Sequence, residues 1–436
     1  MKTTIKLSLL VLGLISCSSF LSGQNYTSYF TGSNLDTLTS PEGGICMMGG
    51  ATENDEAMKW FLQRAKGGDI LVLRASGSNG YNNYLYSELG VSVNSVETIV
   101  FENSLASQDP YVQGRISKAE AIWFAGGDQW DYVSYWRGSP VDSLINLGIQ
   151  NRNIVIGGTS AGMAILGGYY FSAENGTISS TAALNNPFHE NLTISSEPFL
   201  SNFWLQDVVT DTHYDDPTRK GRHFVFLARA SLNTGSPVKG IACDEYTSVC
   251  IDENGMARVF GGYPEFDDQA YFLQANCEVE ENHPETISPG IPLTWHQNGM
   301  AVKVCRIKGT NSGENSFDLQ TWENDSGGEW FNWSVSLGTL AETPSDPIMC
   351  SPTGVRIDGP DIKFHAFPNP NQNSLTVSSS SFINTVKLIN NRGIQIREYD
   401  ISAFSSTLEL PELAAGTYFI EIQAVEGSHI EIIQIL

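Results

Sequence analysis

One serine in the chain stands in a context typical of a catalytic nucleophile. Residues 158–162 read Gly-Thr-Ser-Ala-Gly and lie between an apolar run at 153–156, which predicts a buried strand, and residues 163–166, which predict a helix. GxSxG between a strand and a helix is the pattern of a nucleophile elbow, in which glycines relieve the crowding of a strained turn. The pattern predicts Ser160 as the nucleophile and the backbone N–H of Ala161 as an oxyanion donor. The alternative is a small-residue helix start that packs on the sheet.

A serine hydroxyl needs a base, and the chain has seven histidines to supply one. His365 and His429 lie in a C-terminal region of different character, and His283 lies in an acidic segment that predicts a loop. His213 closely follows residues 205–210, which predict the end of a strand, and it is therefore the best candidate. A structural role is the alternative for any single histidine.

An imidazole base needs a carboxylate to orient it. Residues 240–245 predict a strand that ends in Asp244 and Glu245, and either side chain could take this role. A solvated acidic strand end is the alternative. The order along the chain is Ser160, His213 and then the acid, whereas in α/β-hydrolases the acid precedes the histidine. The elbow is shared with that fold, but the order argues against it.

The charge of the chain indicates what it does not bind and what it could bind. Its 24 Lys and Arg against 48 Asp and Glu give a net charge of −24, which argues against nucleic acid and anionic membranes as partners. Residues 153–218 contain no Lys or Arg, and then Arg219, Lys220 and Arg222 come together after the candidate base. In so acidic a chain this cluster is a natural place for a substrate carboxylate. A set of solvated loop cations is the alternative.

The elements that must position these residues predict an α/β architecture. Continuous apolar runs alternate with helical patterns from residue 45 onward, and they cover residues 45–50, 69–75, 98–101, 121–125 and 153–156. Continuous runs are typical of strands buried on both faces by helices. Asn54 is placed to cap a helix that extends to Lys66. We therefore expect a mostly parallel sheet flanked by helices, with the site in loops at the carboxyl ends of strands.

Four motifs in one order resemble the cyanophycinase and aspartyl-dipeptidase family of serine peptidases. They are residues 124–129, 158–162, 211–214 together with 219–222, and 240–245. The resemblance covers residues 41–308 and implies a fold similar to class I glutamine amidotransferases, with serine in place of cysteine at the elbow. It implies no metal and no organic cofactor.

The resemblance also implies a role for individual residues. It makes Ser160 the nucleophile, His213 the general base and Glu245 the acid that orients it. The residues that it places around the substrate are Gly127 and Ala161 in the oxyanion hole, and Gln129, Asp211, Arg219 and Arg222 as candidates for substrate binding. Family members that cleave cyanophycin carry a glutamine where this chain has Thr212, and an arginine-rich run that here begins with Pro217. The resemblance thus extends to the hydrolytic residues but not to the whole recognition loop.

The last 70 or so residues resemble the sorting domain of type IX secretion cargo. The motifs are Phe-Pro-Asn-Pro at 367–370, alternating strands at 374–377 and 417–422, an Asn-Arg-Gly turn at 391–393, and a terminal strand at 431–436. The resemblance implies the type IX secretion machinery as a partner and a secreted or cell-surface location. An appended carbohydrate-binding-like sandwich is the alternative.

These observations predict four parts of the chain. They are a signal peptide at 1–23, a cyanophycinase-like peptidase domain at 24–308, a β-rich extension or linker at 309–362, and a small all-β sorting domain at 363–436. Cys17 lies in a lipobox-like context and leaves a lipoprotein signal open. Six cysteines follow, an even number that permits disulfides. Cys243 and Cys250 are the closest pair and form either a bridge or two buried thiols.

The expected function is that of a secreted serine peptidase. It would hydrolyse a peptide or isopeptide bond at an acidic, aspartyl residue through an acyl-enzyme on Ser160. The alternatives are an inactive surface or binding protein that keeps the fold, and a non-peptide amidohydrolase or esterase. The sequence leaves a homodimer open.

Overall fold

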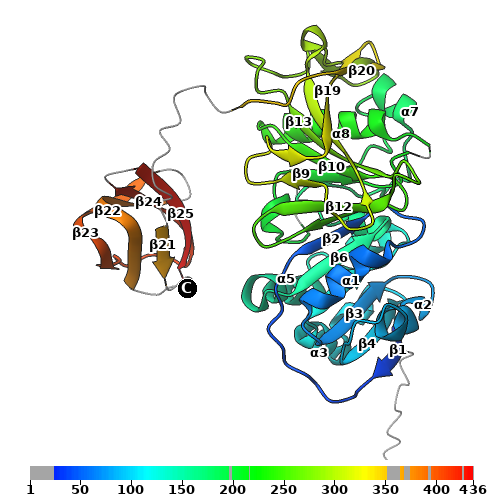
Figure 1. Ribbon diagram of the computed structural model, residues 1–436, viewed down its shortest axis with the longest axis horizontal. Coiled ribbons are helices and arrows are strands. Elements are labelled where there is room, and N and C mark those ends of the chain that lie inside the picture. The colour runs from blue at the N-terminus through cyan, green and yellow to red at the C-terminus, as the bar shows by residue number, and fades with distance from the viewer. Residues whose placement is uncertain are drawn as a thin grey trace, which may run out of the picture. The chain divides into compact units, whose positions relative to one another are not determined.

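A computed structural model describes most of the chain as two compact units. The described residues are 24–195, 199–215, 217–350, 364–367, 374–390, 394–424 and 427–435. The units are Met1–Cys350 and Ser351–Leu436, and each is described by itself (Figure 1). The expected signal peptide and the turn expected at 391–393 lie outside the described residues. No helix in the described part of the chain is long and apolar enough to span a membrane.

A mixed sheet, here called sheet A, forms one half of the larger unit. Its described strands follow the order β1-β4-β3-β5-β6-β2-β11-β12-β17-β18, and those from β4 to β2 are parallel while the other pairs are antiparallel. Their bounds are β1 Tyr26–Gly32, β2 Ile45–Met48, β3 Asp69–Arg74, β4 Ser95–Phe101, β5 Ala121–Phe124, β6 Val155–Thr159, β11 Ser248–Ile251, β12 Met256–Tyr263, β17 Ser316–Asp318 and β18 Asp325–Ser326. The expected parallel sheet is confirmed for β4 to β2. The antiparallel strands correct the expectation for the rest.

Helices cover both faces of the parallel strands. On one face lie α1 (Asp55–Arg64) and the short helical segment formed by α2 (Gly80–Asn83) and η1 (Tyr84–Glu88). On the other face lie α3 (Pro110–Lys118), α4 (Gln129–Trp136) and α5 (Pro140–Arg152). Helix α1 begins where the sequence predicts, because the Asn54 side chain accepts hydrogen bonds from two N–H groups of its first turn.

A second sheet, here called sheet B, was not foreseen as a separate layer. Its described strands follow the order β20-β19-β16-β13-β10-β9, and only the β9–β10 pair is parallel. Their bounds are β9 Val208–Asp211, β10 Lys239–Cys243, β13 Gln269–Ala275, β16 Val302–Lys308, β19 Gly328–Ser336 and β20 Thr339–Pro344. Helix α8 (Lys220–Thr234) connects β9 to β10 and packs on both.

The segment after residue 308 belongs to the larger unit. We expected a β-rich extension or linker there; the segment is rich in strands, but it supplies β17 and β18 to sheet A and β19 and β20 to sheet B. Its aromatic side chains explain the difference, since Phe317, Trp330 and Trp333 are buried in the two cores. Residues 309–344 therefore complete both sheets and do not stand apart from them.

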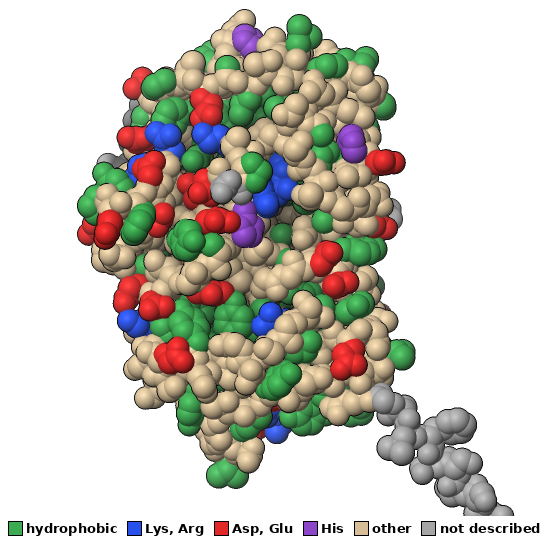
Figure 2. Space-filling view, turned by 90° about the vertical axis from the view of Figure 1, so that its right-hand side faces the viewer, with side chains coloured by type: hydrophobic (Ala, Val, Ile, Leu, Met, Phe, Trp, Pro, Cys, Tyr) green, Lys and Arg blue, Asp and Glu red, His purple; other side chains and the backbone are tan. Residues whose placement is uncertain are grey.

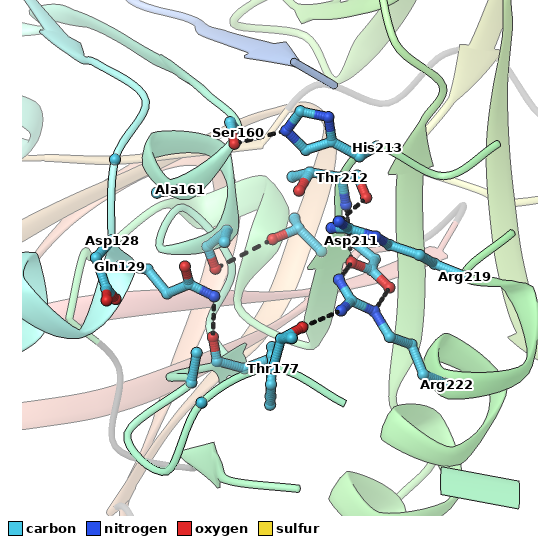
Figure 3. Close-up of a pocket in the computed structure, with 16 residues that line it drawn as sticks. Asp128, Gln129, Ser160, Ala161, Thr177, Asp211, Thr212, His213, Arg219 and Arg222 are labelled. Atoms are coloured by element: carbon cyan, nitrogen blue, oxygen red, sulfur yellow. Dashed lines mark hydrogen bonds and ion pairs between the residues drawn. The ribbon is translucent and has the colours of Figure 1, made fainter. Parts of the chain in front are cut away.

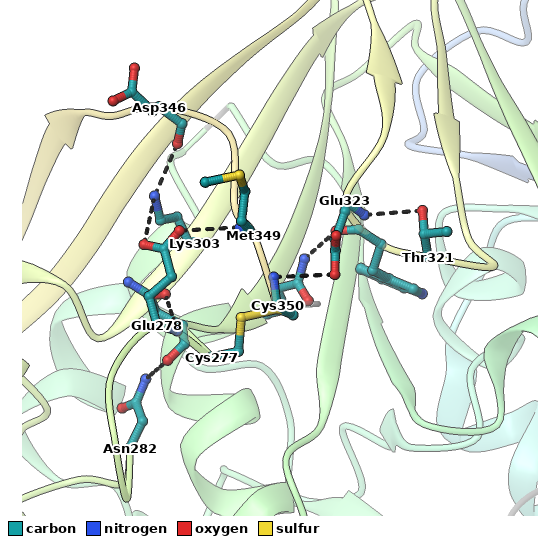
Figure 4. The surroundings of a disulfide bond; sticks show 12 residues. Cys277, Glu278, Asn282, Lys303, Thr321, Glu323, Asp346, Met349 and Cys350 are labelled. Carbon is teal, nitrogen blue, oxygen red and sulfur yellow. Dashed lines mark hydrogen bonds and ion pairs between the residues drawn. A yellow bond between two sulfur atoms is a disulfide. The ribbon is translucent and has the colours of Figure 1, made fainter. Parts of the chain in front are cut away.

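One disulfide closes the larger unit at its C-terminal end. Cys277 and Cys350 form this bond, which links positions 73 residues apart (Figure 4). The other described cysteines, Cys46, Cys243, Cys250 and Cys305, are free and buried. A bridge between Cys243 and Cys250 is therefore wrong, and both are buried thiols.

The smaller unit is an antiparallel β-structure, as expected for the C-terminal region. Its described strands pair in the order β21-β22-β24-β25, and β23 pairs with β22. Their bounds are β21 Phe364–Phe367, β22 Ser374–Asn390, β23 Gln395–Glu409, β24 Gly416–Ala424 and β25 Gly427–Ile435. Alternate residues such as Leu375 and Val377, or Ile420 and Ile422, are buried in its core, which is the period-two pattern of a one-sided sheet.

Candidate active site

Ser160 occupies a strained turn between β6 and the short helix α6 (Ala161–Ala164). Its backbone has φ 53° and ψ −115°, a left-handed conformation that is rare for a residue with a side chain. Glycine is required two residues later, since a Cβ on Gly162 would lie 2.0 Å from the carbonyl oxygen of Phe124. The chain can thus turn sharply against β5, as an elbow requires.

The other two members of the predicted catalytic set come from sheet B. His213 follows β9 and Glu245 follows β10, and because these strands are parallel neighbours their carboxyl ends meet at one edge. The Oγ of Ser160 lies 2.7 Å from Nε2 of His213, and Nδ1 of His213 lies 2.6 Å from Oε1 of Glu245 (Figure 3 shows the first contact). The three side chains therefore form one hydrogen-bonded chain across the two sheets.

The end of β2 aligns the three segments that carry this chain. Carbonyl oxygens of three successive residues, Met48, Gly49 and Gly50, accept in turn the N–H groups of Ser160 (3.0 Å), His213 (2.8 Å) and Tyr246 (3.2 Å). A side chain on Gly50 could not be accommodated, since its Cβ would lie 2.3 Å from the imidazole ring. The sequence predicted a buried strand within residues 45–50 but indicated no role for the glycines at its end.

A cavity of about 280 Å³ opens beside Ser160. Its walls come from the elbow, the loop before α4, the segment that follows β7 (Tyr170–Phe171), and the start of α8 (Figure 3). The lining includes the predicted site residues Gly127, Gln129, Ser160, Ala161, Asp211, His213, Arg219 and Arg222. Glu245 stands behind His213 and does not line the cavity. Sequence reasoning missed the wall formed by Phe171, Ala173, Gly176 and Thr177, because that segment carries no reactive side chain to mark it.

Arg222 and Asp211 form a buried ion pair in the wall of the cavity. Nε and Nη2 of Arg222 contact the two carboxylate oxygens of Asp211, and Nη1 donates to the hydroxyl of Thr177 at 3.2 Å. Both side chains are at least 95% buried. Burial alone would raise the pKa of Asp211, but the adjacent Arg222 guanidinium lowers it below its ordinary value. The positive charge of Arg222, which we expected to bind a substrate carboxylate, is thus largely neutralised by Asp211.

Arg219 forms no ion pair among the described residues, although Asp211, Glu245 and Asp215 lie near enough to act on its charge. Its Nη1 donates to the carbonyl oxygen of Thr212 at 3.0 Å, and its side chain lines the cavity. Burial and the neighbouring Arg222 lower the pKa of Arg219, although a guanidinium stays charged at neutral pH. Figure 2 shows basic side chains gathered beside a histidine on a face where acidic side chains predominate.

Two further candidates from the sequence, Lys220 and Gln129, contact other groups of the protein. Lys220 pairs with Glu342 at 3.0 Å and does not line the cavity, so the predicted trio of cations is divided. Gln129 lies at the start of α4, lines the cavity, and donates from Nε2 to the carbonyl oxygen of Phe171 at 3.3 Å. That contact fixes the orientation of the amide, with its oxygen left to face other partners.

Asp244 and Glu245 are adjacent but have different surroundings. Glu245 contacts His213, whereas Asp244 is 3% exposed and its Oδ1 has no hydrogen-bond partner among the described residues. Burial, aided by the nearby Asp215, raises the pKa of Asp244 to about 8. Of the two carboxylates that the sequence left open, Glu245 is the one beside the imidazole.

The geometry agrees with what comparison of the chain with known proteins finds. Its residues 50–255 match peptidase family S51. This S51 region contains Ser160, His213 and Glu245. Three cyanophycinases resemble the chain: those of Synechococcus elongatus and of Thermosynechococcus vestitus are each 22% identical over 50% of it, and that of Geminocystis herdmanii is 23% identical over 41%. The matches span 66%, 66% and 58% of these relatives, less than two thirds of their length.

Solved structures similar to the S51 region include two peptidases. A peptidase from an acI-B1 actinobacterium is 15% identical, with 53% of this chain and 91% of that chain covered and a TM-score of 0.39. A putative peptidase E from Listeria monocytogenes is 12% identical, with 50% and 98% covered and a TM-score of 0.32. A fold of the class I glutamine amidotransferase type stays a prediction.

The smaller unit has a match of its own. Residues 365–435 match the secretion system C-terminal sorting domain. This match confirms the sequence-based interpretation of the region and indicates export by type IX secretion to the cell surface or the extracellular space.

Proposed function

We propose that the chain is a secreted serine peptidase that cleaves a peptide or isopeptide bond at an acidic, aspartyl residue. The observation that carries the proposal is the hydrogen-bonded chain from Ser160 through His213 to Glu245, at the mouth of a cavity that also contains Arg219. The match of residues 50–255 to peptidase family S51 supports the same chemistry.

In the first step of the proposed mechanism, Oγ of Ser160 attacks the scissile carbonyl carbon and forms a tetrahedral intermediate. Nε2 of His213 accepts the serine proton, and Glu245 stabilises the resulting imidazolium through Nδ1–H. The N–H groups of Gly127 and Ala161 are assigned to the oxyanion, because both residues line the cavity beside Ser160. The intermediate collapses when His213 returns the proton to the leaving amine, which departs and leaves an acyl-enzyme.

Water completes the reaction. His213 takes a proton from the water as it attacks the ester carbonyl, and the second tetrahedral intermediate expels Ser160 with that proton returned to Oγ. The residues of this chain are sufficient for each proton transfer.

Arg219 is the residue that we assign to recognition of the substrate carboxylate. Its guanidinium lines the cavity and forms no ion pair among the described residues, whereas Arg222 is paired with Asp211. A small cavity lined by a guanidinium that no described carboxylate holds in an ion pair favours a side chain with one carboxylate. Gln129 is assigned to the polar groups of the substrate beside it.

A fluorophosphonate probe tests whether Ser160 is a nucleophile. We expect the probe to label the wild-type protein and not the Ser160→Ala variant, with circular dichroism as the check that both are folded. A folded wild type that resists labelling would support the alternative of an inactive binding protein. A library of α- and β-aspartyl dipeptides, with matched asparaginyl and ester substrates, then tests specificity. Equal turnover of aspartyl and asparaginyl substrates would contradict the assignment of Arg219, and turnover of esters alone would favour an esterase.

A further inference from the structure

We propose that the hydroxyl of Tyr132 is a positioning group for the oxyanion hole. It holds the peptide between Gly126 and Gly127 so that the N–H of Gly127 faces the reacting carbonyl. This inference rests on the proposed function and adds a residue that lies outside every motif considered in the sequence.

The hydroxyl of Tyr132 contacts two backbone carbonyl groups of the loop before Gly127. Oη of Tyr132 lies 2.9 Å from the carbonyl oxygen of Ala125 and 3.0 Å from that of Gly126. Both carbonyls belong to the loop between β5 and α4, and Tyr132 reaches back to them from the first turns of α4. The single hydroxyl proton is therefore shared between two carbonyls immediately before Gly127.

The planar peptide between Gly126 and Gly127 links this hydrogen bond to the direction of the Gly127 N–H. The carbonyl of Gly126 and the N–H of Gly127 belong to one planar trans peptide, so they point in opposite directions. A donor on the Gly126 oxygen therefore sets the direction of the Gly127 N–H. Because glycine has no side chain to restrict its dihedral angles, this peptide would otherwise rotate more freely than most.

The ring of Tyr132 is held firmly enough for this role. It is fully buried and stacks on Trp136 with centroids 4.6 Å apart and planes 6° apart. Trp136 in turn packs against Phe101 and Phe199. Burial raises the pKa of Tyr132 above its ordinary value, so the hydroxyl remains a protonated donor.

The hydroxyl of Tyr132 occupies the space that a side chain on Gly127 would need. A Cβ on Gly127 would lie 2.7 Å from Oη of Tyr132, closer than real Cβ contacts occur. At Gly126 the nearest atom to such a Cβ is 3.6 Å away, so the restriction is specific to the residue that is assigned to the oxyanion hole. Tyrosine at 132 and glycine at 127 therefore fit one another.

A misdirected N–H should weaken the transition state more than the bound substrate, because the oxyanion develops its charge only during the reaction. We expect Tyr132→Phe to lower kcat about tenfold to a hundredfold on a dipeptide that the wild type cleaves, with KM changed less than twofold. Affinity for a peptide aldehyde, which forms a tetrahedral adduct on Ser160, should fall by a similar factor. Affinity for the cleaved acidic product should stay unchanged.

Tyr135→Phe is the matched control, because this half-buried tyrosine lies on the same helix and its hydroxyl makes no hydrogen bond to the loop among the described residues. It should behave as the wild type. A Tyr132→Phe enzyme with wild-type kcat would overturn the inference, and so would equal losses of aldehyde and product affinity, which indicate a structural role.

A second variant keeps the inference testable if Tyr132→Phe does not fold. Gly127→Ala places its Cβ against the hydroxyl and should lower kcat and aldehyde affinity together while product affinity is kept. Unchanged values would overturn the inference.

Measurements on the wild type separate this inference from the proposed function. If the wild type shows no Ser160-dependent turnover, the proposed function and this inference are both overturned. If the wild type is active and Tyr132→Phe is unaffected, only the inference is overturned.

Discussion

The two sheets contribute to the site in different ways. Sheet A supplies the proposed nucleophile after β6, a strand inside the parallel run, and the turn is formed by residues adjacent in sequence. Sheet B and the helix α8 supply the proposed base, the proposed acid and the arginines, and the remaining strands of sheet B come from residues 269–344. The turn at Ser160 is thus formed by local sequence and anchored on Met48 and β5, whereas His213, Glu245 and the arginines are brought together by contacts between segments distant in sequence. We therefore expect substitutions around Ser160 in sheet A to affect mainly kcat. Substitutions in sheet B should affect kcat, stability or specificity, depending on the residue.

The largest effect is expected where sheet B takes part in the chemistry. Glu245→Gln should lower kcat about 10³- to 10⁴-fold, because an amide neither stabilises the imidazolium nor holds the correct tautomer. Steady-state kinetics on an aspartyl dipeptide measure it. Asp244→Asn is the matched control at the neighbouring carboxylate, and it should reduce kcat far less. Similar losses in both variants would show that the strand end acts as a structural unit.

The next effect should appear in stability. Arg222→Ala leaves the Asp211 carboxylate buried without its partner, and we expect the free energy of unfolding to fall by about 3–5 kcal/mol. Urea denaturation monitored by tryptophan fluorescence measures the loss. The double variant Asp211→Asn, Arg222→Met should recover part of it. A fully stable Arg222→Ala protein that loses only acidic-substrate turnover would restore Arg222 as a substrate ligand.

A pH-dependent effect of intermediate size is expected at Asp244. Its folded-state pKa of about 8 exceeds the value of about 3.9 in an unfolded chain, so the folded state binds more protons between these values. Stability therefore falls as the pH rises through this window. Asp244→Asn removes the ionisation, and its stability relative to the wild type should rise by about 2 kcal/mol from pH 6 to pH 8. Thermal unfolding at both pH values tests this, and a difference that does not change with pH would contradict it.

The smallest effect should be confined to specificity. Arg219→Ala should lower kcat/KM for aspartyl substrates about tenfold to thirtyfold, the value of one hydrogen bond to a charged group. Labelling of Ser160 by a neutral fluorophosphonate should be unchanged. Lys220→Ala is the matched control, since Lys220 pairs with Glu342 away from the cavity. If both substitutions reduced turnover equally, general electrostatic attraction would explain the preference better than a specific contact.

The same contrast explains what could be predicted from the sequence. The elbow, the cap at Asn54 and the apolar runs of the parallel strands are encoded by neighbouring residues, and the structure confirms these elements. Sheet B was missed because antiparallel pairing of β13, β16, β19 and β20 depends on contacts that no local period records. The neutralisation of Arg222 was missed for the same reason, since its partner precedes it by eleven residues and meets it only after β9 and α8 have packed.

The bond between Cys277 and Cys350 has a mechanical consequence for an exported chain. Cys350 is the last residue of the larger unit, and Cys277 lies two residues after the end of β13, a strand inside sheet B. Without the bond, tension applied beyond residue 350 would act first on β20, an edge strand, and could unzip it from β19 one hydrogen bond at a time. With the bond, the load passes to the end of β13, a strand that is paired on both sides within sheet B. The larger unit is thereby protected from a pull on its C-terminal end.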